Sequence, residues 1–206
     1  MNASPARHHE ETRTSDFQIT RRVEFCDTDM AGIMHFSNFF RFMEAAETAF
    51  LRSLGLSVLL SRCGLEVCLP RVHAECDYLA PLHFEDEVLI HLLVERKGAR
   101  SLTYQFRFYR LGSPDRRQVA RGRLVLACAT RQGNGILKSV PLPGALAGKI
   151  QPAPPQLLAA GLISSRVGSV GANSGSPGGA ANPTASTTAT PRRLRGTNHS
   201  IVLPLL

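Results

Sequence analysis

Two aspartates, a glycine and a histidine stand close together in the segment 23–39, whose sequence is VEFCDTDMAGIMHFSNF. A carboxylate in a loop beside apolar residues can keep its charge if backbone N–H groups hold it. It can then attack a carbonyl carbon or take a proton from water. Gly32 permits a bound molecule to come close to the backbone. The segment therefore predicts acyl-transfer or hydrolytic chemistry, with Asp27 or Asp29 as the carboxylate.

A helix pattern begins directly after this loop. Ser37 or Asn38 could cap its first turn. The backbone N–H groups from Phe36 to Asn38 and the positive end of the helix dipole could hold the negative oxygen that forms during acyl transfer. A carboxylate and an oxyanion site would then face each other across one short segment.

Simpler interpretations exist for the same residues. Asp27 and Asp29 could only cap a turn, because aspartate often does so between a strand and a helix. An Asp-x-Asp pair could bind a metal, but no regular set of further oxygen ligands follows. His35 could be a surface histidine rather than a substrate contact. Zinc-type ligands occur only at poor spacing, in Cys63, Cys68, His73 and Cys76. We therefore expect no metal site.

The elements that would position the loop follow from the hydrophobic periods. Alternating apolar residues predict a strand over 17–25. Steps of three and four residues predict an amphipathic helix over 37–54, which Gly55 would end. Runs rich in Val, Leu, Phe and Tyr predict four more strands over 66–78, 87–95, 101–109 and 118–130. One long helix against a mostly antiparallel sheet of about five strands is an α+β arrangement, and its uncovered edges favour self-association.

Composition divides the chain into three parts. Residues 1–16 are polar and are expected to form a disordered arm. Residues 17–149 have the mixture of a globular domain, whereas 150–206 are dominated by Ala, Gly, Pro, Ser and Thr. That last part predicts a low-complexity, disordered tail.

The net charge of +8 raises the question of an anionic partner. Four of the arginines lie in the tail, which has no acidic residue, and the rest of the excess forms local clusters near 96–110 and 116–123. Such clusters suit the phosphates of a small ligand as well as a nucleic acid, and no nucleic-acid-binding motif accompanies them. We expect no nucleic-acid partner.

The cellular setting is predicted from two absences in the sequence. No apolar run approaches the roughly 20 residues that cross a bilayer, and the N-terminal segment lacks the apolar centre of a signal peptide. We therefore expect a cytoplasmic protein with no membrane insertion. Five cysteines, an odd number lying mostly in apolar runs, favour reduced thiols inside the core.

The segment from Val23 to Glu44 resembles the signature of the 4-hydroxybenzoyl-CoA thioesterase-like family of hotdog proteins, which includes the Tol-Pal-associated acyl-CoA thioesterases. That signature reads approximately V-x-[YF]-x-D-[TC]-D-x-x-G-[IV]-[VM], followed by spaced aromatic residues and an acid. Residues 78–82 and Asp86 are similar to a later strand entry of the family, and 98–101 to its hairpin that meets coenzyme A. The resemblance spans about residues 17–145.

The resemblance implies a hotdog fold, in which a curved antiparallel sheet wraps a long central helix. It also implies a homodimer or a homotetramer built as a dimer of dimers, with active sites between subunits. Asp29 matches the catalytic aspartate and Asp27 the acid that shapes the loop. Arg100 and Ser101 become candidates for contact with the nucleotide end of coenzyme A.

Two departures from the family concern aromatic residues. Many relatives have tyrosine at the positions of Phe25 and Phe39, and some have histidine at that of Phe36. We expect His35 to orient or contact the substrate rather than to catalyse.

The resulting hypothesis is an acyl-CoA thioesterase that releases free acid and coenzyme A, with no cofactor beyond the coenzyme A of its substrate. Asp29 would act as nucleophile or general base, and Gly32, His35, Phe36, Ser37 and Asn38 would surround the substrate carbonyl. The alternative is a hotdog module that binds acyl-CoA or acyl carriers without catalysis. The acyl group, the choice between the two mechanisms and the number of subunits stay open at this stage.

Overall fold

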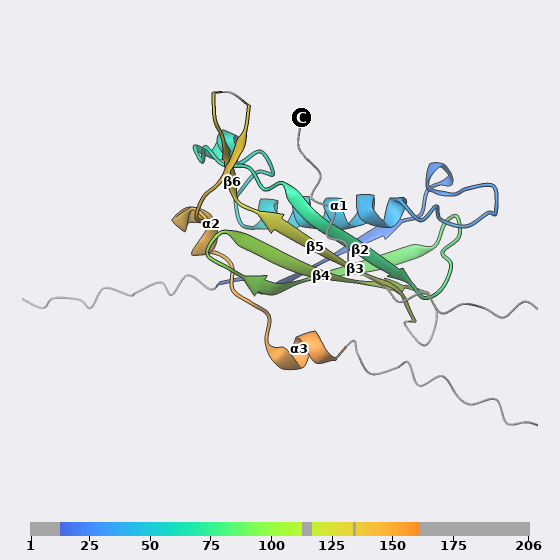
Figure 1. The fold of residues 1–206 in the computed structure, drawn as a ribbon. Coiled ribbons are helices and arrows are strands. Elements are labelled where there is room, and N and C mark those ends of the chain that lie inside the picture. The colour runs from blue at the N-terminus through green and yellow to red at the C-terminus, as the bar shows by residue number, and fades with distance from the viewer. Residues whose placement is uncertain (1–12, 113–116, 134, 161–206) are drawn as a thin grey trace, which may run out of the picture. The chain divides into compact units, whose positions relative to one another are not determined.

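The sheet and one long helix make up the framework of the protein. The structure, a computed structural model, describes residues 13–112, 117–133 and 135–160. Five antiparallel strands form the sheet in the order β1 (Asp16–Arg22), β3 (Glu87–Lys97), β4 (Ser101–Arg110), β5 (Gln118–Ala127) and β2 (Arg71–Tyr78). Helix α1 (Asn38–Ser53) lies across one face of this sheet (Figure 1). The predicted α+β class is confirmed.

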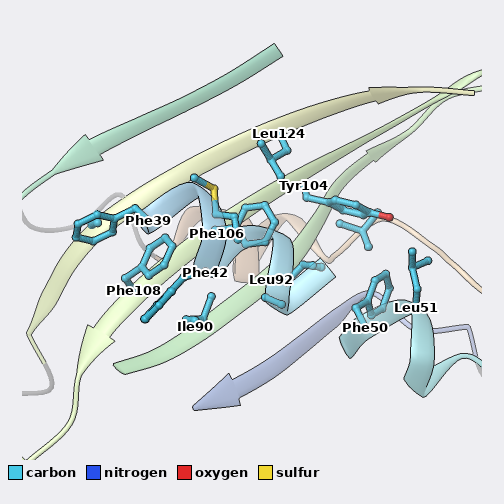
Figure 2. Close-up of a cluster of buried hydrophobic side chains, with 14 of the residues drawn as sticks. Phe39, Phe42, Phe50, Leu51, Ile90, Leu92, Tyr104, Phe106, Phe108 and Leu124 are labelled. Carbon is cyan, nitrogen blue, oxygen red and sulfur yellow. The ribbon is translucent and has the colours of Figure 1, made fainter. Parts of the chain in front are cut away.

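The core lies between α1 and the sheet. Phe39, Phe42 and Phe50 of the helix meet Tyr104, Phe106 and Phe108 of β4, and all six side chains are buried (Figure 2). A Cβ atom at Gly122 would collide with the sulfur of Met43, so glycine there lets the helix approach β5. Burial of each large side chain stabilises the fold by roughly 2–3 kcal/mol. The helix is thereby fixed, and the loop before it acquires a fixed starting point.

The ends of the helix differ from what the sequence predicts in one respect. Gly55 follows the helix with φ +71°, as expected of a glycine that ends a helix. Neither proposed N-terminal cap is present, because Ser37 makes no capping hydrogen bond and the Asn38 side chain instead donates to the carbonyl oxygen of Asp27 at 2.8 Å. The amide of Asn38 thus fastens the preceding loop rather than the helix.

Several strand boundaries are also corrected. The first strand ends at Arg22, and Phe25–Asp27 form a short 3₁₀ turn, η1. Strand β2 begins only at Arg71, because Pro70 precedes it and residues 60–63 form a second 3₁₀ turn, η2. The expected strand 118–130 divides at Cys128 into β5 and the short β6 (Ala129–Arg131), which pairs with β7 (Leu137–Ser139).

The expected tail boundary at residue 150 is wrong. Helices α2 (Gly144–Ala147) and α3 (Pro155–Ala159) follow the sheet, and Ile150 and Ala153 are buried. The backbone N–H of Ala153 donates to the carbonyl oxygen of Val94 at 2.8 Å. Residues 161–206 of the expected tail and residues 1–12 of the expected arm lie outside the described residues, whereas residues 13–16 lead into β1 through a bridge between Thr14 and Ile150.

The cysteines are reduced thiols but mostly not core residues. All five are free, and only Cys128 is buried, whereas Cys26, Cys63 and Cys68 are exposed. Cys76 is partly buried and packs against the core.

Candidate active site

The loop that joins β1 to α1 is built around Asp27. This side chain is buried and accepts a hydrogen bond from the backbone N–H of Glu24 at 3.0 Å. The backbone carbonyl oxygen of Asp27 accepts two more hydrogen bonds, from the backbone N–H of His35 and the side-chain amide of Asn38, each at 2.8 Å. Asp27 therefore ties the start of the loop to the start of the helix.

Asp29 occupies the tip of the same loop. Its backbone N–H donates to Ile33 and its carbonyl oxygen accepts from Gly32, each at 2.9 Å, and Gly32 has φ +72°, a value that favours glycine. One carboxylate oxygen accepts from the N–H of Ala31 at 2.8 Å. The turn-capping role that the sequence allowed is thus present. The second carboxylate oxygen accepts no hydrogen bond within the described part of the chain, and the side chain is exposed.

The helix start next to this loop carries His35, Phe36 and Ser37. The Nδ1 atom of His35 lies 2.8 Å from the Ser37 hydroxyl, and the rings of His35 and Phe36 lie tilted by 35° with centroids 4.4 Å apart. The carbonyl oxygen of Phe36 accepts from the Tyr78 hydroxyl at 3.2 Å. Among the hydrogen bonds of the described residues, none is donated by the N–H of Phe36. That amide is a free donor at the positive end of α1.

Apolar side chains surround the loop without being covered. Exposure is 78% for Phe25, 107% for Met30, 59% for Phe36 and 49% for Phe84. Phe25 and Phe84 meet edge to face with centroids 6.1 Å apart, although α1 and β2 lie between them in sequence. A concentration of exposed aromatic residues marks a surface that binds something.

Arg100 and Ser101 lie at the other end of the sheet. They form the turn between β3 and β4, where the N–H of Gly98 donates to the carbonyl oxygen of Ser101 at 2.9 Å. The Asp29 loop joins the sheet near Val88, since the N–H of Val23 donates to Asp86, and the nine steps from Val88 to Lys97 span roughly 30 Å. Figure 1 shows the two ends on opposite sides of the molecule. Within one chain, Arg100 and Ser101 therefore lie far from Asp29. The other predicted site residues lie in the Asp29 loop or at the helix start that follows it: Gly32, His35, Phe36, Ser37 and Asn38.

A second polar cluster lies inside the protein and was not predicted. The Glu47 carboxylate on α1 is 1% exposed and contacts the Arg71 guanidinium of β2 at 2.6 Å. Arg71 also lies 3.6 Å from Glu44. The nearby Tyr104 hydroxyl is buried and has no hydrogen-bond partner among the described residues. Burial raises the pKa of Glu47 to about 7, although the charge of Arg71 acts in the opposite direction.

Metal ligands do not gather within residues 13–112, 117–133 and 135–160, where no group of three or more His, Cys, Asp or Glu residues could hold an ion. In the same part of the chain, no helix is long and apolar enough to span a membrane.

Comparison with known proteins decides the family. The family model described as the thioesterase-like superfamily matches residues 23–161, which include the loop, α1 and the whole of the sheet except β1. This chain belongs to the thioesterase-like superfamily. The protein is therefore a thioesterase, and the family resemblance noted from the segment 23–44 is confirmed.

Individual relatives agree with membership in the thioesterase-like superfamily. A putative esterase from Aquifex aeolicus (strain VF5) is 41% identical over 91 residues, which are 44% of this chain and 70% of the relative. A 1,4-dihydroxy-2-naphthoyl-CoA hydrolase from Synechococcus sp. (strain WH7803) is 34% identical over 102 residues, which are 46% of this chain and 67% of the relative. The crystal structure of a 1,4-dihydroxy-2-naphthoyl-CoA thioesterase from Synechocystis has a TM-score of 0.60 and 27% identity, covering 66% of this chain and 95% of that one. The hotdog fold is confirmed by this likeness.

Proposed function

We propose that this thioesterase hydrolyses an acyl-CoA to free acid and coenzyme A, with Asp29 as the reacting carboxylate. The observation that carries the proposal is a carboxylate on a hydrogen-bonded turn, close in sequence to the N–H of Phe36 at the helix start. Among the described residues, one oxygen of this carboxylate accepts no hydrogen bond and that N–H donates none. The hydrolase from Synechococcus sp. and the thioesterase from Synechocystis are both named for 1,4-dihydroxy-2-naphthoyl-CoA, which favours an aromatic acyl group.

In the proposed reaction, the carbonyl oxygen of the thioester accepts from the N–H of Phe36 and the positive end of α1. Asp29 then acts in one of two ways. As a nucleophile it attacks the carbonyl carbon, and the C–S bond breaks to release the thiolate. One water then hydrolyses the acyl-enzyme anhydride: its hydroxyl adds to the acyl carbon, the Asp29 carboxylate is released, and its proton goes to the thiolate. As a general base it takes a proton from a water that attacks the carbonyl carbon, and the departing thiolate receives that proton.

The neighbouring residues have supporting roles in this proposal. Gly32 gives the turn its positive φ and leaves no Cβ in the path of the substrate. Ser37 orients the imidazole of His35, which faces the substrate beside Phe36, and Asn38 holds the loop through Asp27. Each proposed step uses only these groups and water, and coenzyme A enters as part of the substrate.

We also propose that two chains pair through their β2 strands. Among the described strands, β2 has a partner on one side only, at the edge of the sheet, and seven of its eight residues are exposed, including Val72 and Tyr78. An open edge of this kind is a template for pairing with another strand. The exposed aromatic residues near the Asp29 loop continue from the end of this edge, since the Tyr78 hydroxyl bonds to Phe36.

Such pairing would complete the coenzyme A site. Strand β2 starts beside the β3–β4 turn, because the N–H of Ala127 donates to Pro70 and Ala127 pairs with Ser101. It ends at Tyr78, beside the Asp29 loop. Two β2 strands that pair antiparallel place the start of one beside the end of the other. Arg100 and Ser101 of each chain would then lie on the side of the partner's Asp29, where the guanidinium could bind coenzyme A phosphates. The proposal is a homodimer, or a tetramer made of two such dimers.

A thiol-release assay over a panel of aromatic and aliphatic acyl-CoA esters tests the function. We expect turnover of at least one aromatic ester and a loss of a hundredfold or more in Asp29→Asn. Asp16→Asn is the matched control, since Asp16 is a partly exposed carboxylate at the β1 edge, paired with His91. Equal rates in wild type and Asp29→Asn would refute the role of Asp29. Tight binding of acyl-CoA without thiol release would instead support the non-catalytic alternative.

A further inference from the structure

The pairing of Arg71 with Glu47 raises the question of why an edge strand sends an arginine inward. Arg71 is the first residue of β2, and its side chain is 34% exposed at the open edge of the sheet. A single guanidinium nitrogen, Nη2, makes its contacts with Glu47 and Glu44. The other two nitrogens have no acceptor within the described residues. Arg71 thus holds a fixed position with donors to spare, because an arginine fork offers five N–H bonds.

The direction of Arg71 is set by the sheet. Arg71, Ala74, Cys76 and Tyr78 all lie on the face of β2 that meets α1, as the contact of Tyr78 with Phe39 and that of Arg71 with Glu47 require. A β-bulge at Val72 lets the side chain of Arg71 join this series. Arg71 therefore shares a face with the residues that border the Asp29 loop.

Dimer geometry then places Arg71 near the other chain's loop. In a fully paired antiparallel arrangement of two β2 strands, residue 71 of one lies opposite residue 78 of the other, with Cα atoms about 5 Å apart. Tyr78 in turn contacts Phe36, whose N–H is the proposed oxyanion donor. The partner's Arg71 would thus stand beside the acyl group and not beside the nucleotide.

The charge around Arg71 defines what it could bind. Glu44 and Glu47 flank the guanidinium, so a strongly anionic group such as a phosphate would meet two carboxylates as well. A hydroxyl or phenolate oxygen needs only one or two hydrogen-bond donors and can bind beside the two carboxylates. The Tyr104 hydroxyl beside Glu47, which has no hydrogen-bond partner in the described part of the chain, adds hydrogen-bonding capacity to the same cluster.

We propose that Arg71, positioned by Glu47, acts across the dimer and recognises a ring hydroxyl of the acyl group bound at the partner's Asp29. The inference rests on the proposed function and names a substrate class for it, hydroxylated aromatic acyl-CoA esters. Arg71 is the contact residue and Glu47 the positioning residue.

The test compares kcat/KM for 1,4-dihydroxy-2-naphthoyl-CoA and 2-naphthoyl-CoA. We expect wild type to prefer the hydroxylated ester, and Arg71→Lys to lower that preference about tenfold, since lysine keeps the charge beside Glu47 but not the planar fork. Glu47→Gln should lower it less, because Arg71 remains. Arg121→Lys, at an exposed arginine paired with Asp77 on the same sheet, is the control and should leave the preference unchanged.

Mixed dimers of Asp29→Asn and Arg71→Lys chains separate action across the dimer from action within one chain. The intact Asp29 in such a dimer faces an intact Arg71 of the partner, so the preference should return. A preference that stays low in the mixed dimers would overturn action across the dimer, and an unaltered preference in Arg71→Lys would overturn the role of Arg71. Wild type that hydrolyses both esters equally well refutes the inference alone, whereas wild type that hydrolyses no acyl-CoA refutes the proposed function.

Discussion

Two carboxylates in this protein lie in opposite surroundings. Glu47 lies between α1 and the sheet, 1% exposed and held by one arginine. Asp29 lies on an exposed turn, where its carboxylate accepts from one backbone N–H, among aromatic side chains that the other described residues leave exposed. A search for the most perturbed acid would choose Glu47, whose pKa is raised by burial. The proposed function uses Asp29 instead, because Asp29 lies close in sequence to the amide of Phe36 at the helix start, which donates no hydrogen bond among the described residues.

The most strongly perturbed carboxylate of a single chain need not be the reacting one, and this matters most if the active site lies between two subunits, as proposed. A buried carboxylate costs stability wherever it occurs, and structural ion pairs perturb pKa values as catalytic sites do. An exposed carboxylate becomes reactive only after a partner or a substrate removes water from it. Substitutions at the buried Glu47–Arg71 pair should therefore alter the free energy of unfolding, and substitutions in the Asp29 loop should alter turnover.

The largest effect on stability is expected from Arg71→Ala. This change leaves the Glu47 carboxylate buried without its cation, and breaking a buried pair costs about 3–5 kcal/mol. Urea unfolding at pH 8 and a fixed protein concentration measures the loss. The double variant Arg71→Met with Glu47→Met should recover most of it, because the charge that lacked a partner is also removed. A loss below about 1 kcal/mol in Arg71→Ala would show that water already reaches Glu47.

The next largest effect concerns pH. The pKa of Glu47 is raised from 4.5 to about 7, so the folded protein holds a proton that the unfolded chain has released between these values. Stability from this group is therefore present at low pH and is lost as the pH rises from about 4.5 to 7, by up to about 3 kcal/mol. Glu47→Gln should lack this component. Urea unfolding of the wild type and of Glu47→Gln from pH 5 to pH 8 measures this component. The same pH dependence of the free energy of unfolding in both proteins would contradict the prediction.

A smaller effect is expected at Arg107, another buried charged side chain, which contacts α3. The buried Arg107 donates from Nη2 to the carbonyl oxygens of Leu157 at 2.8 Å and Leu158 at 2.7 Å. Arg107→Ala should cost about 2 kcal/mol, since hydrogen bonds to charged groups contribute about 1.5–3 kcal/mol. Hydrogen exchange should become faster in residues 153–159 and stay unchanged in α1. Equal protection of residues 153–159 in both proteins would show that Arg107 does not hold α3.

The contacts of Arg107 with α3 and of Arg71 with Glu47 could not be predicted from the sequence. Helix α1 and five strands could be predicted because spacing of apolar residues records which face is buried, and Gly55 records where a helix ends. The ordered segment 150–160 could not, because Ala and Pro carry no period and its anchor, Arg107, is about 50 residues away. The Glu47–Arg71 pair spans 24 residues and was hidden for the same reason.

The smallest effect on stability should come from Asp29→Asn, the change expected to abolish turnover. Asparagine keeps a side-chain oxygen that can accept from the N–H of Ala31, and it suits the same kind of turn. The side chain is exposed, so neutralising it relieves no burial. We expect the free energy of unfolding to change by no more than about 0.5 kcal/mol, as for other exposed positions. A large destabilisation would mean that the turn itself needs the charge, and lost turnover in this variant would then no longer identify a reacting carboxylate.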